Sequence, residues 1–437
     1  MAEREKVAHL LRRATFGPTA EEVDAAESAG WEATLSKVLG ASDPKLGPPV
    51  PSITSDPIDS LPREATGEQR EAARKLRETQ TQMIYDWWLD RMVVAGNQLE
   101  EKIAFFWHGH WATSSEKVDS PYLMLLQHKT FRQYGQGDFS HFVKAMVRDA
   151  ALILWLDNQK NSRRAPNENL ARELMELFTL GIGNYTEDDV KAGARALTGW
   201  TVERGNGRVR LENGRYDAGD KTILGQTGKF DADGLVDILL NRAASPRFIA
   251  KRIWFRFGSG EQMSEATLHR LVSAYSIGKG LTTLMNAVFT DPSFLEARAM
   301  LVKQPVEWAV GAMRQLGIKP SGLAEADRKT LRDHLQGMQQ TLFRPPSVGG
   351  WPSGVTWLTS HTSQVRLRAS EFLATKAPNA TISKLNAAPQ QGRPDALARL
   401  LVVDAWTPRT RAVLDGVAKD VRKLLALGLI SPEYSVQ

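Results

Sequence analysis

The 437-residue chain contains no cysteine. This absence excludes a disulfide scaffold, thiolate-bound zinc, an iron–sulfur cluster and a cysteine nucleophile. Histidine is also scarce, with eight residues. A bound metal ion would therefore need histidine, aspartate, glutamate or asparagine side chains, and few positions offer them.

The chain also lacks long apolar runs and a concentrated charge of one sign. No segment approaches the roughly 18 apolar residues of a membrane span. Lys and Arg number 56 against 50 Asp and Glu, a formal net charge of +6, and the two signs are mixed along the chain. This mixing does not favour nucleic-acid binding. The charged start, Met1 to Lys6, is unlike a secretory leader. We therefore expect a soluble protein that is cytoplasmic as the sequence stands, and periplasmic or exported if a leader has been removed.

Apolar spacing predicts a mainly α, multi-helix fold with a small β insertion. Hydrophobic residues make up 42% of the chain, which is ordinary for a globular protein. Helices are expected over residues 3–14, 67–95, 138–149, 167–181 and 186–199, from near Gln98, and again from about 232 to the end.

Two segments interrupt the helical pattern. Residues 41–62 hold six prolines, which predict an extended surface loop. Residues 200–226 contain Gly205-Asn-Gly207 between two strand-like runs, which is typical of a β-hairpin. The later stretch Lys221–Phe230 is a poor phosphate loop, because its glycine spacing is short and Phe230 stands where Ser or Thr would bind magnesium.

Two histidines lie among aromatic residues in the segment Phe105-Phe-Trp-His108-Gly-His110-Trp111. Imidazole is a common metal ligand and is readily tuned for proton transfer. At i, i+2 spacing on a helix, however, the two rings point to nearly opposite sides. Joint chelation therefore requires the helix to end at Gly109. The alternative is a helix end at which the histidines interact with free carbonyls and the aromatic side chains form core.

The densest polar segment begins with Asp157, directly after the apolar run 151–156, and continues through a predicted helix. Asn167 is the expected N-cap, and Asn169, Glu173 and Glu176 share one helical face. Arg172 lies four residues from both Glu168 and Glu176. We interpret these residues either as a buried carboxylate cluster for acid–base chemistry or a divalent cation, or as a solvated face with weak ion pairs.

A third segment, Leu342–Trp357, combines consecutive prolines and glycines with Trp351 and Trp357. Such a rigid aromatic loop is typical of a binding surface, and the alternative is a packed Ω-loop over the core.

Together these segments resemble the bacterial domain-of-unknown-function family 1800 over roughly residues 5–370. The residues that carry the resemblance, in order, are His9-Leu-Leu-Arg12-Arg13, Phe106-Trp-His108-Gly-His110, Pro166-Asn-Glu-Asn169, Ala194-Arg-Ala-Leu-Thr198-Gly-Trp200, Lys221-Thr-Ile-Leu-Gly225, Lys303-Gln-Pro305 and Gly350-Trp-Pro352.

The resemblance implies no established activity. It implies members that are often exported and genes that often neighbour a phosphatase- or sulfatase-like family, whose product is therefore a candidate partner. This chain has Tyr216-Asp217 where the family usually has a His-Asp pair. The resemblance also sets the expected domain division, with one helical domain over 1–370 and a C-terminal helical extension over 371–437 packed on it.

Our leading hypothesis is a metal-dependent or acid–base enzyme, a hydrolase by default, with one divalent metal ion and no organic cofactor. Its alternative is a non-enzymatic helical assembly or maturation factor that binds a protein or polysaccharide through the aromatic loop. The expected metal ligands are His108, His110, Asp157 and Glu173; the expected catalytic residues are Glu168, Arg172 and Glu176; and the expected binding residues are Asn167, Asn169, Arg164, Trp351 and Trp357.

Overall fold

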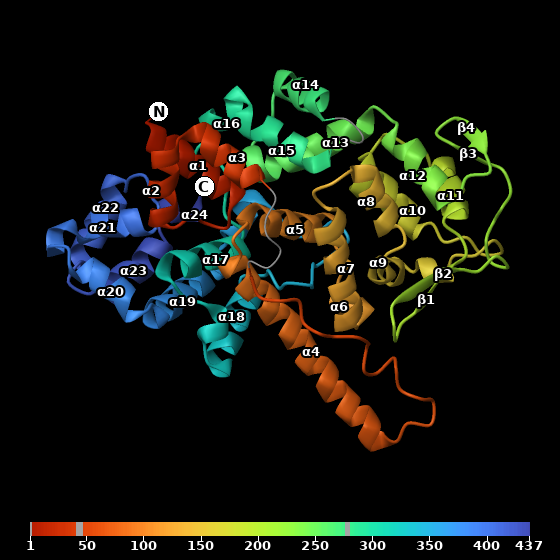
Figure 1. The fold of residues 1–437 in the computed structure, drawn as a ribbon, viewed down its shortest axis with the longest axis horizontal. Helices are drawn as coiled ribbons and strands as arrows, with labels where there is room; N and C mark the ends of the chain where they lie inside the picture. The colour runs from red at the N-terminus through yellow and green to blue at the C-terminus, as the bar shows by residue number, and fades with distance from the viewer. Residues whose placement is uncertain (1, 41–46, 276–279) are drawn as a thin grey trace.

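The structure, a computed structural model, describes residues 2–40, 47–275 and 280–437. Helices dominate the described residues, and the molecule is elongated (Figure 1). The first helices are α1 (Glu3–Ala14), α2 (Ala20–Ala29), α3 (Trp31–Leu39), α4 (Gly67–Val94), α5 (Gln98–His110), α6 (Ser115–Val118), α7 (Pro121–Tyr134), α8 (Phe139–Met146), α9 (Ala150–Trp155), α10 (Asn169–Glu173) and α11 (Glu187–Ala196).

The later helices are α12 (Ala232–Leu240), α13 (Ala244–Ile253), α14 (Glu265–Ala274), α15 (Gly280–Thr290), α16 (Pro292–Glu296), α17 (Pro305–Leu316), α18 (Glu325–Gly337), α19 (Ser360–Lys376), α20 (Asn379–Asn386), α21 (Arg393–Leu400), α22 (Pro408–Val417), α23 (Val421–Leu429) and α24 (Pro432–Ser435). Two π-helical segments, η2 (Leu174–Thr179) and η3 (Trp254–Gly258), continue α10 and α13. Short 3₁₀ turns cover Asn158–Lys160, Pro320–Gly322, Gly354–Trp357 and Gln390–Gly392.

The mainly α prediction is confirmed, and local signals explain the helix starts. Thr19 accepts the backbone N–H of Glu22, and Glu22 accepts that of Thr19, which is a capping box at the start of α2. Thr186 and Asp189 form the same arrangement at α11. The predicted helix over 167–181 is corrected in one respect, because its second half is the π-helical η2 and not α-helix.

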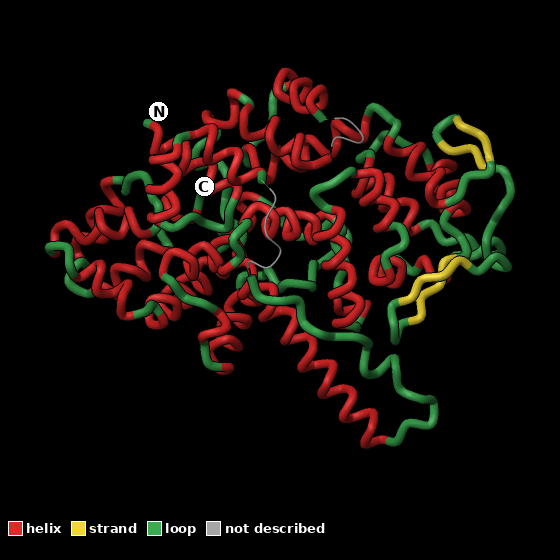
Figure 2. Tube along the Cα trace, viewed as in Figure 1, coloured by secondary structure: helices red, strands yellow, loops and turns green. Residues whose placement is uncertain are grey.

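The strands form two separate antiparallel hairpins, which Figure 2 shows at one end of the molecule. They pair β1 (Trp200–Glu203) with β2 (Arg208–Leu211), and β3 (Lys221–Ile223) with β4 (Gln226–Gly228). The turn of the first hairpin holds Gly205 and Gly207, and Gly207 has φ +68°, a conformation that glycine adopts readily. The predicted hairpin is therefore confirmed.

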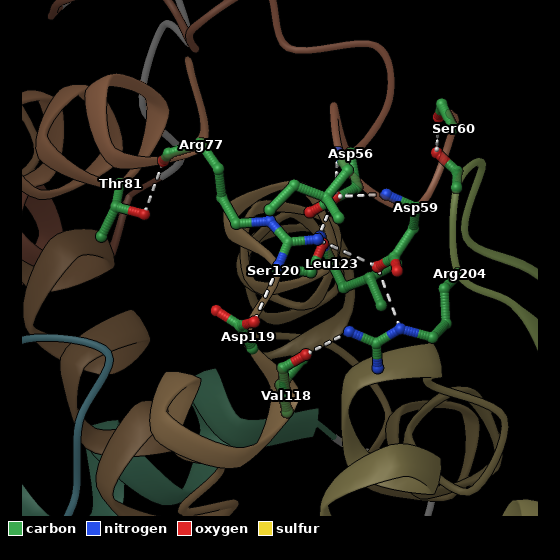
Figure 3. A network of polar contacts seen from close by, with 12 residues as sticks. Asp56, Asp59, Ser60, Arg77, Thr81, Val118, Asp119, Ser120, Leu123 and Arg204 are labelled. Carbon is green, nitrogen blue, oxygen red and sulfur yellow. Dashed lines mark hydrogen bonds and ion pairs between the residues drawn. The ribbon is translucent and has the colours of Figure 1, made fainter. Parts of the chain in front are cut away.

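Helix α4 projects from the body of the molecule (Figure 1). The described part of the proline-rich loop precedes α4 in the chain and runs beside it. Residues 41–46 of the predicted loop lie outside the described residues. Figure 3 shows how the remainder is fixed: Arg77 of α4 pairs with Asp56, with Asp59 (3.3 Å) and with Asp119 (2.7 Å). Arg204 in the turn of the first hairpin also contacts Asp59 (2.9 Å). These ion pairs connect the loop, α4 and the hairpin.

Helix α5 packs against α1, α3, α4 and α7 and lies between two large apolar clusters. Phe106 and Trp107 belong to one cluster, whereas Phe105 belongs to the other. Both faces of α5 are therefore buried, which explains its run of aromatic residues.

The C-terminal segment is helical, and α19 packs along α23. Residue 370, the expected domain boundary, lies inside α19, and the division into a domain and an extension stays a prediction. Among the described helices, none is both long and apolar enough to cross a membrane.

Candidate functional site

His108 faces the apolar cluster that contains Trp88. Its Nε2 accepts the backbone N–H of Phe343 at 2.9 Å, and its ring lies 5.1 Å from the rings of both Trp88 and Trp351. Burial lowers the pKa of His108 to about 3, so the imidazole is neutral. Because Nε2 accepts this hydrogen bond, its lone pair is already engaged with the protein backbone.

His110 faces the other cluster. Its Nε2–H donates to the carbonyl oxygen of Phe178 in η2, at 3.1 Å. This bond fixes the tautomer, so Nδ1 carries the lone pair; Nδ1 is buried without a hydrogen-bond partner. Burial first, and then the charge of Arg252, hold the pKa of His110 well below its ordinary value.

The two histidines do not form the chelating pair that we considered from the sequence. Helix α5 continues through Gly109 and ends at His110, so the rings keep their i, i+2 divergence. Each ring packs against a different apolar cluster, because α5 lies between the two clusters. Joint chelation would require the helix to break at Gly109, and it does not.

The predicted acidic residues lie near the surface and have other partners. Asp157 pairs with Lys117 (2.6 Å) and Lys160 (2.9 Å). Arg172 pairs with Glu168 (2.9 Å) and Glu187 (2.5 Å). These partly exposed ion pairs are those of the solvated-face alternative.

Glu173 and Glu176 lie on the same side of this helix. The Tyr185 hydroxyl donates to Glu176, and Glu173 is partly buried. Burial, followed by the negative charge of Glu176, raises the pKa of Glu173. Neither carboxylate is bonded to His108 or His110, whose ring nitrogens contact backbone groups instead.

Two of the remaining predicted binding residues, Asn167 and Asn169, lie at the start of the helix. Asn167 Oδ1 accepts the N–H of Asn169 at 3.1 Å, although the helix begins one residue later than an Asn167 N-cap would give. Asn169 and Arg164 are exposed. Across residues 2–40, 47–275 and 280–437, no group of three or more His, Cys, Asp or Glu side chains is arranged to hold a metal ion. The predicted metal and catalytic roles therefore stay predictions, and this geometry does not bring those residues together.

The aromatic loop does meet α5. Gly350 has φ +84°, and a Cβ there would lie 2.4 Å from the carbonyl oxygen of Gly109. This close approach places Trp351 against α5, with its ring 6.5 Å from that of Phe105. Trp357, the second predicted tryptophan, is buried in the following 3₁₀ turn. Of the two tryptophans, Trp351 is thus the one positioned to meet a ligand.

A pocket of about 470 Å³ lies where the aromatic loop, α5 and the α13–η3 helix meet. His110 and Trp351, predicted from separate sequence segments, both line it. It lies beside both π-helical segments, since η3 supplies Arg256 and η2 bonds His110 through Phe178. Such segments are rare in helical proteins and are frequent at functional sites.

Among the described residues, three cations and no carboxylate line the pocket. Lys251, Arg252 and Arg256 lie on α13–η3. Arg256 is 8% exposed, its Nη2 has no hydrogen-bond partner, and its guanidinium lies 5.7 Å from the ring centre of Phe105. Among the described residues, no carboxylate lies within ion-pair distance of Arg252. Burial lowers the pKa of Arg252 and of Arg256.

Sequence reasoning missed these three cations. The signal that could have found them is the concentration of three basic and three aromatic residues over Lys251–Phe257. The segment lies about 140 positions after α5 and about 85 before the aromatic loop, so its place in the site depends on tertiary packing.

Comparison with known proteins gives a family and no function. No curated protein and no solved structure matches the chain. The family described as "Protein of unknown function (DUF1800)" matches residues 9–436, which extends beyond the segment that carried the resemblance. The chain therefore belongs to the DUF1800 family.

Proposed function

We propose that the protein binds an organic anion that carries a ring, in the pocket between α5, the α13–η3 helix and the loop around Trp351. The observation that carries the proposal is a cavity that the described residues line with three cations, five aromatic rings and no carboxylate. The proposal concerns binding, and it applies equally to an enzyme and to a non-enzymatic factor.

The charge of the lining favours an anion. Arg252 has no ion-pair partner among the described residues, and Arg256 shares one carboxylate, that of Glu307 (3.4 Å). Arginine donates paired hydrogen bonds to carboxylate and phosphate groups, and such bonds are about twice as strong as neutral ones. A divalent cation would be repelled by the same residues, so the proposed ligand differs from the metal ion expected from the sequence.

The aromatic lining favours a ring. The Trp351 side chain is partly exposed at the pocket, and Phe105 and Phe255 lie beside it. Aromatic faces bind planar rings and the apolar faces of sugars, and ligand pockets commonly combine such walls with a few polar groups. A volume of about 470 Å³ accommodates a small organic molecule.

Phenyl phosphate is a suitable probe, titrated by calorimetry at fixed ionic strength. We expect binding that Arg252→Gln weakens about tenfold or more, because a charge-assisted hydrogen bond is lost. Trp351→Ala should also weaken binding. Arg247→Gln is the matched control, since Arg247 lies on α13 but pairs with Glu265 outside the pocket. Absence of binding, or equal binding by Arg252→Gln and the unmodified protein, would overturn the proposal.

A further inference from the structure

Behind the pocket lies a group of buried cations, here called the cation cluster. Each member is at most 8% exposed, and the members come from α1, α5, η3, the segment before α17, and α19. They are Arg13, Lys102, Arg256, Lys303 and Arg366, and electrostatic interactions with Glu307 or with one another connect them. Arg256 belongs to both the cluster and the pocket, so the two are continuous.

Among the described residues, a single carboxylate forms ion pairs with this cluster. Glu307 Oε1 lies 3.3 Å from Lys102 Nζ and 3.4 Å from Arg256 Nη2. Glu307 Oε2 accepts the backbone N–H of Gln304 at 3.0 Å. Among the described residues, no other carboxylate lies within 4.0 Å of a cluster cation.

The remaining contacts of the cluster are with neutral groups, and among the described residues Nε and Nη1 of both Arg13 and Arg366 have no hydrogen-bond partner. Lys102 also donates to the carbonyl oxygen of Thr15 (2.8 Å), and Arg13 donates to that of Ala297 (2.5 Å). Lys303 Nζ lies 3.7 Å from the ring centre of Tyr434. These contacts provide dipoles and a ring face but no negative charge, so positive charge exceeds negative charge in this buried region.

Burial penalises the protonated side chains of the cluster, and it holds the pKa of Lys303 well below its ordinary value. Burial lowers the pKa of Lys102 to about 8 and that of Arg13 to about 9, and the attraction of Glu307 only partly opposes it. In a medium of low dielectric constant, an additional negative charge nearby would stabilise these cations strongly. Arg256 provides the place where such a charge could be bound.

We infer that the pocket selects a dianionic group, that of a phosphate monoester, over a monoanion of the same shape. This inference rests on the proposed function. A dianion loses more hydration energy than a monoanion when it enters a pocket, so selection requires a compensating field. The uncompensated cations behind Arg256 supply that field, whereas a pocket with paired arginines would not.

Phenyl phosphate and phenyl sulfate test the inference because they share a shape and differ in charge. The phosphate monoester is largely dianionic above its second pKa of about 6, whereas the sulfate ester remains a monoanion. At about pH 7.5 we expect phenyl phosphate to bind about tenfold more tightly. The ratio of the two affinities should shrink toward about pH 6, where half of the phosphate is a monoanion.

A cluster variant provides the second measurement. Lys102→Met removes one positive charge from behind the pocket, and Lys102 does not line the pocket. Because a dianion interacts with the lost charge about twice as strongly as a monoanion, the variant should weaken phenyl sulfate binding severalfold and phenyl phosphate binding by about the square of that factor. The affinity ratio should therefore fall severalfold. If Lys102→Met does not fold, Arg366→Met provides the same test from α19.

The outcomes separate the inference from the proposed function. Equal affinity for the two probes, with both lost in Arg252→Gln, would overturn the selection of a dianion and leave the anion pocket intact. Failure of both probes to bind would overturn the proposed function as well. A ratio that stays constant in both Lys102→Met and Arg366→Met would show that the cation cluster does not set the selectivity.

Discussion

Acidification should destabilise the protein through four buried histidines, His9, His108, His110 and His128. Each is at most 1% exposed. Burial lowers the pKa of His9 and of His108 to about 3, and it holds the pKa values of His110 and His128 well below the ordinary range. The folded protein therefore keeps all four imidazoles neutral at pH 5.

The direction of the effect follows from proton linkage. Unfolded histidines have pKa values of about 6.5, so below that pH the unfolded chain binds protons that the folded chain does not. The stability contribution is fully present above pH 6.5 and is lost as the pH falls toward the folded pKa of about 3. Each histidine loses about 2 kcal/mol between pH 7 and pH 5, or about 8 kcal/mol for the four.

Asp149 acts in the opposite direction. Burial raises its pKa to about 6, so the folded state gains a proton before the unfolded state does. This gain is about 1 kcal/mol at pH 5, which leaves a loss of about 6 to 7 kcal/mol from these five groups together. A loss of that size is comparable to the whole stability of many domains, so we expect the protein to unfold near pH 5.

Urea unfolding followed by circular dichroism at a series of pH values measures the effect. The slope of the unfolding free energy with pH should correspond to about three protons taken up on unfolding, four from the histidines and one fewer from Asp149. His108→Gln should reduce the uptake by about one proton, whereas His269→Gln, at an exposed position, is the matched control. An uptake of less than one proton between pH 6.5 and pH 5 would refute the reasoning.

Two further predictions concern the loops. Gly350→Ala should destabilise the protein by about 2 kcal/mol or more, because alanine is strained at φ +84° and its Cβ would meet the Gly109 carbonyl. The thermal midpoint measures this loss. Gly416→Ala is the control, because a Cβ at Gly416 has no other atom within 4 Å. A midpoint for Gly350→Ala equal to that of the unmodified protein would contradict this explanation. Arg77→Met should cost about 3 to 5 kcal/mol, because it leaves the fully buried carboxylate of Asp56 without its cation. Limited proteolysis should then cut the 47–66 loop faster, and an unchanged cleavage rate would argue against the ion pairs as its anchor.

Local features of the fold were predictable from the sequence because neighbouring residues decide them. The capping box at Thr19, the bounds of α1 and α4, and the hairpin at Gly205-Asn-Gly207 follow from contacts within a few positions. The change from α- to π-helix at Leu174 was not predictable in this way. The composition of α10 and η2 is that of an ordinary amphipathic helix, and the wider turn accompanies packing against α12 and α13.

The candidate site also has features that the sequence identified and features that only the tertiary structure decided. The sequence by itself identified His110 and Trp351 as residues of interest, and it determined that two histidines at i, i+2 on a continuous helix diverge. Only the tertiary structure decided which apolar cluster received each ring, that the acidic residues remained at the surface, and that Arg252 and Arg256 joined Trp351 in one pocket. The reason is physical: helical periodicity acts over a few residues, whereas the meeting of α5, η3 and the aromatic loop depends on the burial of apolar surface between segments about a hundred positions apart.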